Sequence, residues 1–325
     1  MKKNKGCLLF YILIFFIIII SIEISLRQKY YSEYKLIDER MKEIEIESLY
    51  IQSENKELIY ESIFPLEMLD YNKKEEVYRI IIIGDSIAKG QGLKDDLNSS
   101  FGKLLEQELN SNKNKTEYEV IIFAASGYST SQEIILLKEK ALKYKPNLIL
   151  WSYVLNDPAN PRYHDGNGEF GIYFNKPKIY FIEYINKKIF FFNEKRIFNK
   201  KKCEQEYHKL LHCVYWEDIK KNIEEIANIS KEENIKTIFL IHPIFENSYN
   251  YSNYSLNNLH KQIKEEIKKN NLLVLDILDI YKNYNPYNLR LNSQDPWHPN
   301  EIGHEIIKDY IYSFLKENIK GFKEK

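Results

Sequence analysis

Hydrophobic and polar positions change in regular blocks from about residue 77 onward. Short runs that are almost wholly apolar predict β-strands buried on both faces; they cover residues 78–83, 119–124, 147–153, 237–242 and 272–276. Longer segments between them carry apolar residues at helical spacing, which predicts helices over 100–111, 131–143, 216–232, 255–269 and 300–318. Strands and helices therefore alternate along this part of the chain.

The alternation predicts an α/β fold, a three-layer α/β/α sandwich whose mostly parallel sheet has five strands. Crossovers between parallel strands should be right-handed. Ligand sites in such sheets lie at the carboxyl ends of the strands, so residues that directly follow a strand are the first candidates for chemistry. We place this domain at residues 77–318, with a stalk at 27–76 and a short tail at 319–325.

The N-terminus carries a basic tip, Met1–Lys5, followed by an almost unbroken apolar run, Cys7–Ile22. The run continues past Glu23 and is long enough to span a bilayer. A secretory signal peptide is the alternative, but no small-residue cleavage site follows. We therefore favour an uncleaved anchor at residues 1–26, with a cytoplasmic tip and a single pass through the cell membrane. The lysines favour an extracytoplasmic domain, and Arg27 and Lys29 on the far side weaken that orientation.

An insertion at residues 158–211 interrupts the alternation after the third strand. Residues 178–192 in it carry apolar side chains at helical spacing, at Ile179, Ile182, Ile185, Ile189 and Phe192. The insertion is rich in aromatic residues and in lysine. We favour a helical cap packed on the domain with a solvated basic rim. A surface for a sugar or an anionic polymer, and contact with anionic lipid headgroups, are the alternatives.

Composition narrows the function without identifying it. The 325 residues carry 47 basic and 47 acidic side chains, so the net charge is zero, which argues against nucleic-acid binding driven by bulk electrostatics. The three cysteines have no zinc-site spacing. Cys203 and Cys213 could form a disulfide or remain two thiols, and the sequence favours neither.

Two short motifs supply the parts of a nucleophilic site. Ser86 closes the motif Gly-Asp-Ser directly after the first predicted strand, and His298 follows Asp295 by three residues near the C-terminal end. A serine hydroxyl needs a base to take its proton, and a carboxylate can orient that base. Gly127 follows the second strand, where a glycine lets a backbone N–H approach a reacting oxygen. Asn156 follows the third strand, where its amide can donate to a developing oxyanion.

The four places Ser86, Gly127, Asn156 and His298, in this order, resemble the SGNH (GDSL-type) hydrolase family over about residues 77–318. The resemblance implies a flavodoxin-like sheet and no cofactor or metal. It implies that Ser86 attacks an ester, that His298 is the base held by Asp295, and that the N–H groups of Ser86 and Gly127 and the Asn156 amide form the oxyanion hole. Ile87 and Val154 depart from the family pattern, and Val154 stands where a glycine is usual.

The expected function is a membrane-anchored serine esterase that removes O-acyl groups, O-acetyl above all, from an envelope glycan or lipid. One alternative is acyl transfer to a cell-surface polysaccharide, because a sugar hydroxyl can resolve the same acyl-enzyme. Another is a catalytically silent glycan-binding module. A metal trio of Asp295, His298 and His304 is a further interpretation, but the proline-rich turn suits a dyad better. The oligomeric state is left open.

Overall fold

The computed structural model describes residues 9–29, 71–111, 116–158, 179–245, 251, 253–319 and 322. Two compact units make up the chain. Residues 48–161 and 203–325 form the larger unit, and residues 1–47 and 162–202 form the smaller one. The larger unit contains the sheet and all five candidate site residues, and the smaller unit contains two long helices.

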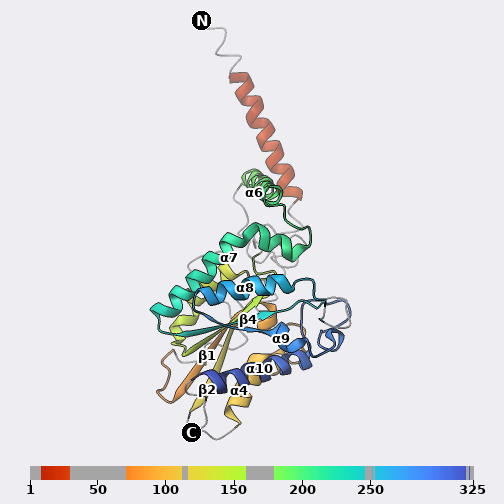
Figure 1. Ribbon diagram of the computed structural model, residues 1–325. Helices are drawn as coiled ribbons and strands as arrows, with labels where there is room; N and C mark the ends of the chain where they lie inside the picture. The colour runs from red at the N-terminus through yellow and green to blue at the C-terminus, as the bar shows by residue number, and fades with distance from the viewer. Residues whose placement is uncertain are drawn as a thin grey trace. The chain divides into compact units, whose positions relative to one another are not determined.

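Five parallel strands form the sheet of the larger unit, in the order β2-β1-β3-β4-β5 (Figure 1). Their bounds are β1 Val77–Gly84, β2 Glu117–Ala124, β3 Leu148–Val154, β4 Lys236–His242 and β5 Leu273–Asp276. Every end lies within about two residues of the prediction, the usual uncertainty of element boundaries. The predicted α/β class with a five-stranded parallel sheet is therefore confirmed.

Helices cover both faces of this sheet. The helices α4 (Phe101–Asn110) and α10 (Glu301–Asn318) pack together on one face, and α5 (Thr130–Glu139), α7 (Tyr207–Glu232) and α8 (Asn257–Lys269) cover the other (Figure 1). Shorter helical segments are α2 Ser86–Lys89, α3 Asp96–Ser99, η2 Ala141–Tyr144, α9 Ile277–Tyr281 and η4 Pro286–Asn288. The result is the expected three-layer sandwich.

The second half of strand β1 is deeply buried. It lies between β2 and β3, and each of the four residues Ile80–Ile83 is 0% exposed. Because side chains alternate between the two faces of a strand, these isoleucines contribute to the core on both sides. Burying one such side chain stabilises a fold by roughly 1.5–3 kcal/mol. The strand that ends in the Gly-Asp-Ser motif is thus a rigid base for the loop that follows.

Two helices differ from their predicted bounds by more than two residues. The helix predicted over 131–143 ends at Glu139, where Lys140 leaves helical geometry (φ −127°) and a separate 3₁₀ turn follows. Helix α7 begins at Tyr207, nine residues before the predicted start at 216. Its cap is Glu206, whose carboxylate accepts from the N–H of Lys209 at 2.9 Å. Because glutamate is an uncommon N-cap, the sequence did not mark this helix start.

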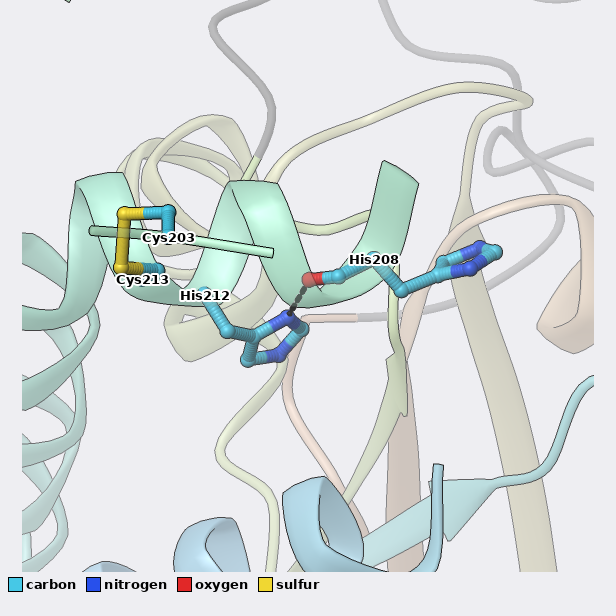
Figure 2. The surroundings of a disulfide bond; sticks show 4 residues. All are labelled: Cys203, His208, His212 and Cys213. Carbon is cyan, nitrogen blue, oxygen red and sulfur yellow. Dashed lines mark hydrogen bonds between the residues drawn. A yellow bond between two sulfur atoms is a disulfide. The ribbon is translucent and has the colours of Figure 1, made fainter. Parts of the chain in front are cut away.

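A disulfide ties the first turns of α7 to the segment before it. Cys203 and Cys213 are bonded, which resolves the pairing that the sequence left open (Figure 2). Directly before Cys213, the Nδ1–H of His212 donates to the carbonyl of His208, one turn earlier, at 2.8 Å. The other ring nitrogen of His212 must then accept, and it does so from the hydroxyl of Tyr153 at 3.1 Å. The disulfide and this hydrogen bond both hold the start of α7.

The smaller unit contains the N-terminal helix Leu9–Lys29 and helix α6 (Tyr180–Lys201). The first of these is long and apolar enough to cross a membrane, a test that a signal sequence also passes. Part of the insertion, residues 159–178, lies outside the described residues. The predicted cap helix exists as α6, but Ile182, Ile189 and Phe192 in its apolar stripe are 51%, 53% and 67% exposed. Whether this stripe packs on the larger unit stays a prediction.

Candidate active site

Ser86 is presented by a sharp turn between β1 and the short helix α2. The carboxylate of Asp85, one residue before it, accepts from the N–H of Ile87 at 3.1 Å and caps that helix. Gly84 has no room for a side chain, because a Cβ there would lie 2.7 Å from the Cβ of Ser152 and 2.8 Å from that of Ala88. Two residues of the motif therefore shape the turn, and the third carries the hydroxyl.

His298 joins this serine to a carboxylate. Its Nε2 lies 2.9 Å from the Oγ of Ser86, and its Nδ1 lies 2.8 Å from the Oδ2 of Asp295. An ionised carboxylate can only accept, so the Nδ1 of His298 carries the proton and the Nε2 accepts from the serine hydroxyl. The three groups form one continuous row of hydrogen bonds, although Ser86 and His298 are 212 residues apart in the sequence.

The loop that carries His298 is fixed from several directions. The other oxygen of Asp295 accepts from the N–H groups of Trp297 and His298 at 2.8 and 3.0 Å. The N–H of Leu291 donates to the carbonyl of His298 at 2.8 Å, and that of Phe245 donates to the carbonyl of Pro296 at 2.7 Å. The imidazole is therefore positioned by backbone contacts as well as by its own hydrogen bonds.

Asp295 is suited to remain ionised beside the histidine. Partial burial acts to raise the pKa of its carboxyl, but the hydrogen bond from His298 and those from the backbone outweigh burial and lower the pKa below 3.8. A permanently ionised partner stabilises an imidazolium that forms next to it. This electrostatic arrangement favours proton transfer from Ser86 to His298.

The other two candidate residues leave the sheet at the same edge. Gly84 of β1 is in register with Ala124 of β2 and with Ser152 of β3. Gly127 follows three residues after Ala124, and Asn156 follows four residues after Ser152. In a sheet of this strand order the ligand crevice lies where β1 separates its two neighbours. The chain positions of Ser86, Gly127 and Asn156 therefore lie just beyond the same edge of the sheet.

Gly127 and Val154 differ in backbone conformation, since only Gly127 has a positive φ. Gly127 has φ 76°, a conformation that favours glycine. Val154 ends β3, is 2% exposed and is not among the residues with positive φ. Its N–H donates to the carboxylate of Asp157 and its carbonyl accepts from the N–H of the same residue, both at 3.0 Å. The loop that presents Asn156 is thus closed by two hydrogen bonds, with a valine in place of the usual glycine.

Three carboxyl groups are buried near the serine: Asp85, Glu133 and Asp157. Burial raises the pKa of Asp85 to about 6. Burial, and then the charge of Asp85, raise the pKa of Glu133 well above 4.5. Burial and the charges of both neighbours raise the pKa of Asp157 well above 3.8. Because like charges cannot share a buried site cheaply, this group holds protons at a pH where exposed carboxyls have lost them.

The remaining buried histidines have structural contacts. His242 pairs with the hydroxyl of Ser152 at 2.9 Å, inside the sheet. His304 accepts from the N–H of Phe101 at 3.1 Å through its Nδ1 and stacks on the ring of that residue. It contributes to the joint between α10 and α4. Among the described residues, no group of three or more histidine, cysteine, aspartate or glutamate side chains could hold a metal ion.

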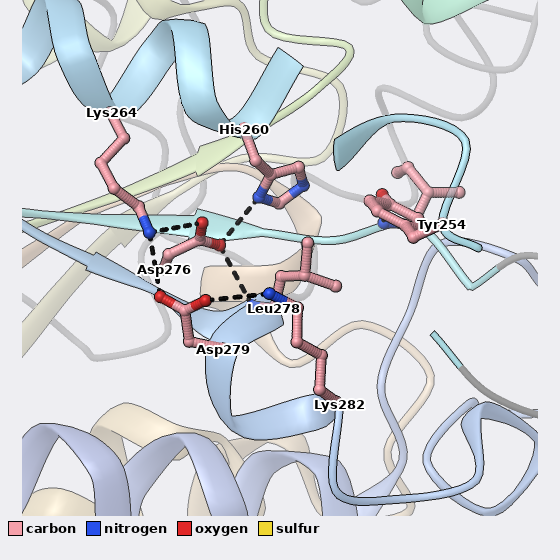
Figure 3. A network of polar contacts seen from close by, with 8 residues as sticks. Tyr254, His260, Lys264, Asp276, Leu278, Asp279 and Lys282 are labelled. Carbon is pink, nitrogen blue, oxygen red and sulfur yellow. Dashed lines mark hydrogen bonds and ion pairs between the residues drawn. The ribbon is translucent and has the colours of Figure 1, made fainter. Parts of the chain in front are cut away.

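A second aspartate–histidine pair lies at the end of β5 (Figure 3). The Nδ1 of His260 lies 2.8 Å from Asp276, whose carboxylate also accepts from the N–H of Leu278 and pairs with Lys264 at 3.0 Å. Among the described residues, the Nε2 of His260 has no hydrogen-bond partner. In the described part of the chain this pair therefore has no nucleophile beside it, and Asp276 serves as the cap of α9.

Sequence reasoning missed one residue beside the loop that carries His298. His208, in the first turn of α7, packs its ring against Trp297 with 5.1 Å between ring centroids. It is 6% exposed and its Nδ1 lies 2.8 Å from the carboxylate of Glu206. The sequence assigned these positions to the insertion. The neighbouring Cys203 and Cys213 were the available signal, because a disulfide there implies an ordered segment.

A serine, an imidazole and a carboxylate in one row, at the carboxyl edge of a parallel α/β sheet, define a class of enzymes that carry acyl groups on a serine. Residues 82–306 match the model of the GDSL-like lipase/acylhydrolase family. The chain belongs to this family and is an ester-hydrolysing enzyme. The resemblance to the SGNH (GDSL-type) hydrolases is confirmed.

Solved structures with this fold differ widely from the chain in sequence. A catalytic mutant of an acetylxylan esterase from Geobacillus stearothermophilus has a TM-score of 0.50 and 15% identity, over 76% of this chain and 96% of that one. An α/β hydrolase from the metagenome of Lake Arreo, Spain, has a TM-score of 0.47 and 16% identity, over 75% and 95%. The esterase EstA from Pseudoalteromonas sp. has a TM-score of 0.43 and 18% identity, over 74% and 97%. No curated protein matches the chain.

Proposed function

We propose that the protein is a membrane-anchored serine esterase that removes O-acyl groups, and O-acetyl groups above all, from an envelope glycan or lipid. The observation that carries the mechanism is the row Ser86–His298–Asp295, with 2.9 and 2.8 Å between the paired atoms. The helix Leu9–Lys29 is the proposed anchor. An acetylated glycan is the first substrate to test, since an acetylxylan esterase shares this fold.

In the acylation step, the Oγ of Ser86 attacks the ester carbonyl and forms a C–O bond. The serine proton moves to the Nε2 of His298, and Asp295 stabilises the imidazolium. The carbonyl π bond opens and its electron pair moves to the oxygen. When the tetrahedral intermediate collapses, the bond to the leaving alkoxide breaks and His298 returns the proton to it. The products are an acyl-serine and a free alcohol.

The oxyanion of that intermediate needs donors that are already in place. The N–H groups of Ser86 and Gly127 and the side-chain amide of Asn156 are the proposed donors. The common register of β1, β2 and β3 at this edge supports the assignment, and so does the positive φ of Gly127. Water then repeats the sequence on the acyl-serine, with His298 as base, and releases the acid.

The test is hydrolysis of p-nitrophenyl acetate and butyrate by the full chain in detergent, compared with Ser86→Ala and His298→Ala. Each variant should lower kcat by about 10⁴-fold or more, as expected when one member of a catalytic row is removed. Asp295→Asn should lower kcat by about 10²–10⁴-fold, because the imidazole loses its orienting acceptor. The ratio of acetate to butyrate rates measures the size of the acyl pocket.

The sheet contains a matched control for these variants. Ser152 and His242 are also a serine–histidine pair at 2.9 Å, but Ser152 is 0% exposed. Ser152→Ala should therefore keep most of the activity while Ser86→Ala loses it. Equal losses in both variants, or an unchanged rate in Ser86→Ala, would refute the proposed nucleophile. Ester turnover that requires an added sugar acceptor would instead identify an acyltransferase.

A further inference from the structure

Helix α6 displays an apolar row that the described structure leaves exposed. Ile182, Ile185, Ile189 and Phe192 follow at spacings of three, four and three, so they lie on one face of the helix. Their exposed fractions range from 38% at Ile185 to 67% at Phe192. Apolar rows of this kind normally face a core. A row of large apolar side chains in water indicates a partner surface.

The charge of α6 indicates what kind of partner surface the apolar row contacts. The helix carries six cations, Lys187, Lys188, Lys195, Arg196, Lys200 and Lys201, against the two acids Glu183 and Glu194. All six cations are exposed. The face with the apolar row continues toward the C-terminus with Arg196 and Lys200, at further spacings of four. An apolar row that ends in cations complements a bilayer, whose acyl chains lie beneath anionic headgroups.

The first turn of α6 is bound to the end of the N-terminal helix. The carboxylate of Glu23 accepts from the N–H of Tyr180 at 3.1 Å and from that of Phe181 at 2.8 Å. Arg27 pairs with Glu23 at 2.8 Å and lies 4.9 Å from the centre of the Tyr180 ring. The residue at the N-cap position of α6, Ile179, makes no side-chain cap. Glu23 therefore supplies a cap from 157 residues away.

Glu23 is the first charged residue after the apolar run of the N-terminal helix, and the polar residues Arg27, Gln28 and Lys29 follow within two turns. The part of this helix before it, Leu9–Ile22, extends roughly 21 Å, about two thirds of the thickness of a hydrocarbon core. A helix whose first turn is held at that point begins at the level of the lipid headgroups. The contacts of Glu23 and Arg27 thus place the start of α6 at the membrane surface. This position favours a bilayer over a partner protein as the surface that covers the apolar row.

We propose that α6 is an interfacial helix that lies on an anionic lipid bilayer, with the row from Ile182 to Phe192 at the boundary between headgroups and acyl chains. Arg196 and Lys200 then meet lipid phosphates. The placement of the start of α6 rests on the proposed membrane anchor. The contact of α6 with lipid is tested separately from it.

The test uses the full chain in lipid nanodiscs that contain brominated acyl chains, which quench tryptophan fluorescence at short range. Phe192→Trp reports on the apolar row, Lys187→Trp on the opposite face, and Phe16→Trp on the anchor; the signal of the wild-type tryptophans is subtracted. Phe192→Trp should be quenched at least about twofold more than Lys187→Trp in discs with anionic lipid. Adding Arg196→Gln and Lys200→Gln to Phe192→Trp should weaken that quenching, because each cation near an anionic surface contributes to binding.

The outcomes separate the two proposals. Quenching of Phe16→Trp without quenching of Phe192→Trp would overturn the interfacial helix and keep the anchor. Quenching of Phe192→Trp alone would keep the interfacial helix and overturn the anchor. A blue-shifted but unquenched Phe192→Trp, in discs that hold two copies of the chain, would overturn the lipid proposal in favour of a protein partner. Unchanged hydrolysis of p-nitrophenyl acetate in each variant verifies the fold.

Discussion

The contact between His304 and α4 leads to a quantitative prediction about acid sensitivity. His304 is 1% exposed, and its Nδ1 accepts from the N–H of Phe101 at 3.1 Å. Burial, and then the charge of His298, lower the pKa of His304 from 6.5 to about 3. The folded protein therefore holds this ring neutral, while the unfolded chain takes up a proton below about pH 6.5. Replacing His304 by asparagine keeps an acceptor for the same N–H and removes the titration.

The sign and size of the effect follow from linkage. A group whose folded-state pKa is depressed contributes stability that is complete above its unfolded pKa and is lost as the pH falls toward the folded value. The loss approaches about 1.4 kcal/mol per pH unit. Between pH 7.5 and pH 5.0 it amounts to about 2 kcal/mol for a shift from 6.5 to about 3. The stability of wild type relative to His304→Asn should fall by that amount over this range.

Urea unfolding of both proteins in detergent, followed by circular dichroism at the two pH values, measures this difference. The asparagine variant also loses stacking on Phe101, but that loss does not depend on pH. Tyr281→Phe is the control, because it removes a buried hydrogen bond of 3.0 Å to the carbonyl of Gly303 without changing a group that titrates in this range. A stability difference between wild type and His304→Asn that stays constant with pH would refute the reasoning.

Three further predictions concern stability. Gly84→Ala should destabilise by at least about 1–3 kcal/mol in urea unfolding, because its Cβ would lie 2.7 Å from that of Ser152; a neutral effect would contradict the close approach. Glu133→Gln should become more stable relative to wild type by up to about 1.4 kcal/mol per pH unit above pH 4.5, since a raised folded-state pKa costs stability as the pH rises; a gain that does not grow with pH would count against a protonated Glu133. Paired Cys203→Ser and Cys213→Ser changes should cost about 2–3 kcal/mol under oxidising conditions, from the separation of 10 residues, and nothing after reduction of wild type.

The secondary structure was readable from the sequence wherever one element determines its own pattern. The isoleucine run that became β1 could only be a strand buried on both faces, and its bounds differ from the prediction by one residue at each end. The dyad spacing of Asp295 and His298 is equally local, because a turn of three residues brings the two side chains together. Helix α7 was misjudged at its start, where a glutamate cap and a disulfide replace the usual signals.

For the candidate site, too, some features were apparent from the sequence and others only from the structure. The residue types at the strand ends, Ser86, Gly127 and Asn156, were apparent from the chain alone, as was the family resemblance. The contact between Ser86 and His298 at 2.9 Å was not apparent from the chain alone. These residues are 212 positions apart, and no local sequence pattern determines the order of strands in a sheet. The same holds for the carboxyl groups of Glu133 and Asp157, whose raised pKa values depend on burial by other elements.

The sequence by itself determined the strands and helices, the apolar N-terminal segment and the residues capable of acyl chemistry, because periodicity and short motifs are properties of neighbouring residues. The tertiary structure decided the strand order, the pairing of Cys203 with Cys213, and the cap that Glu23 provides for α6. These features depend on which distant segments pack together, and packing is chosen by the free energy of the whole fold rather than by any one segment.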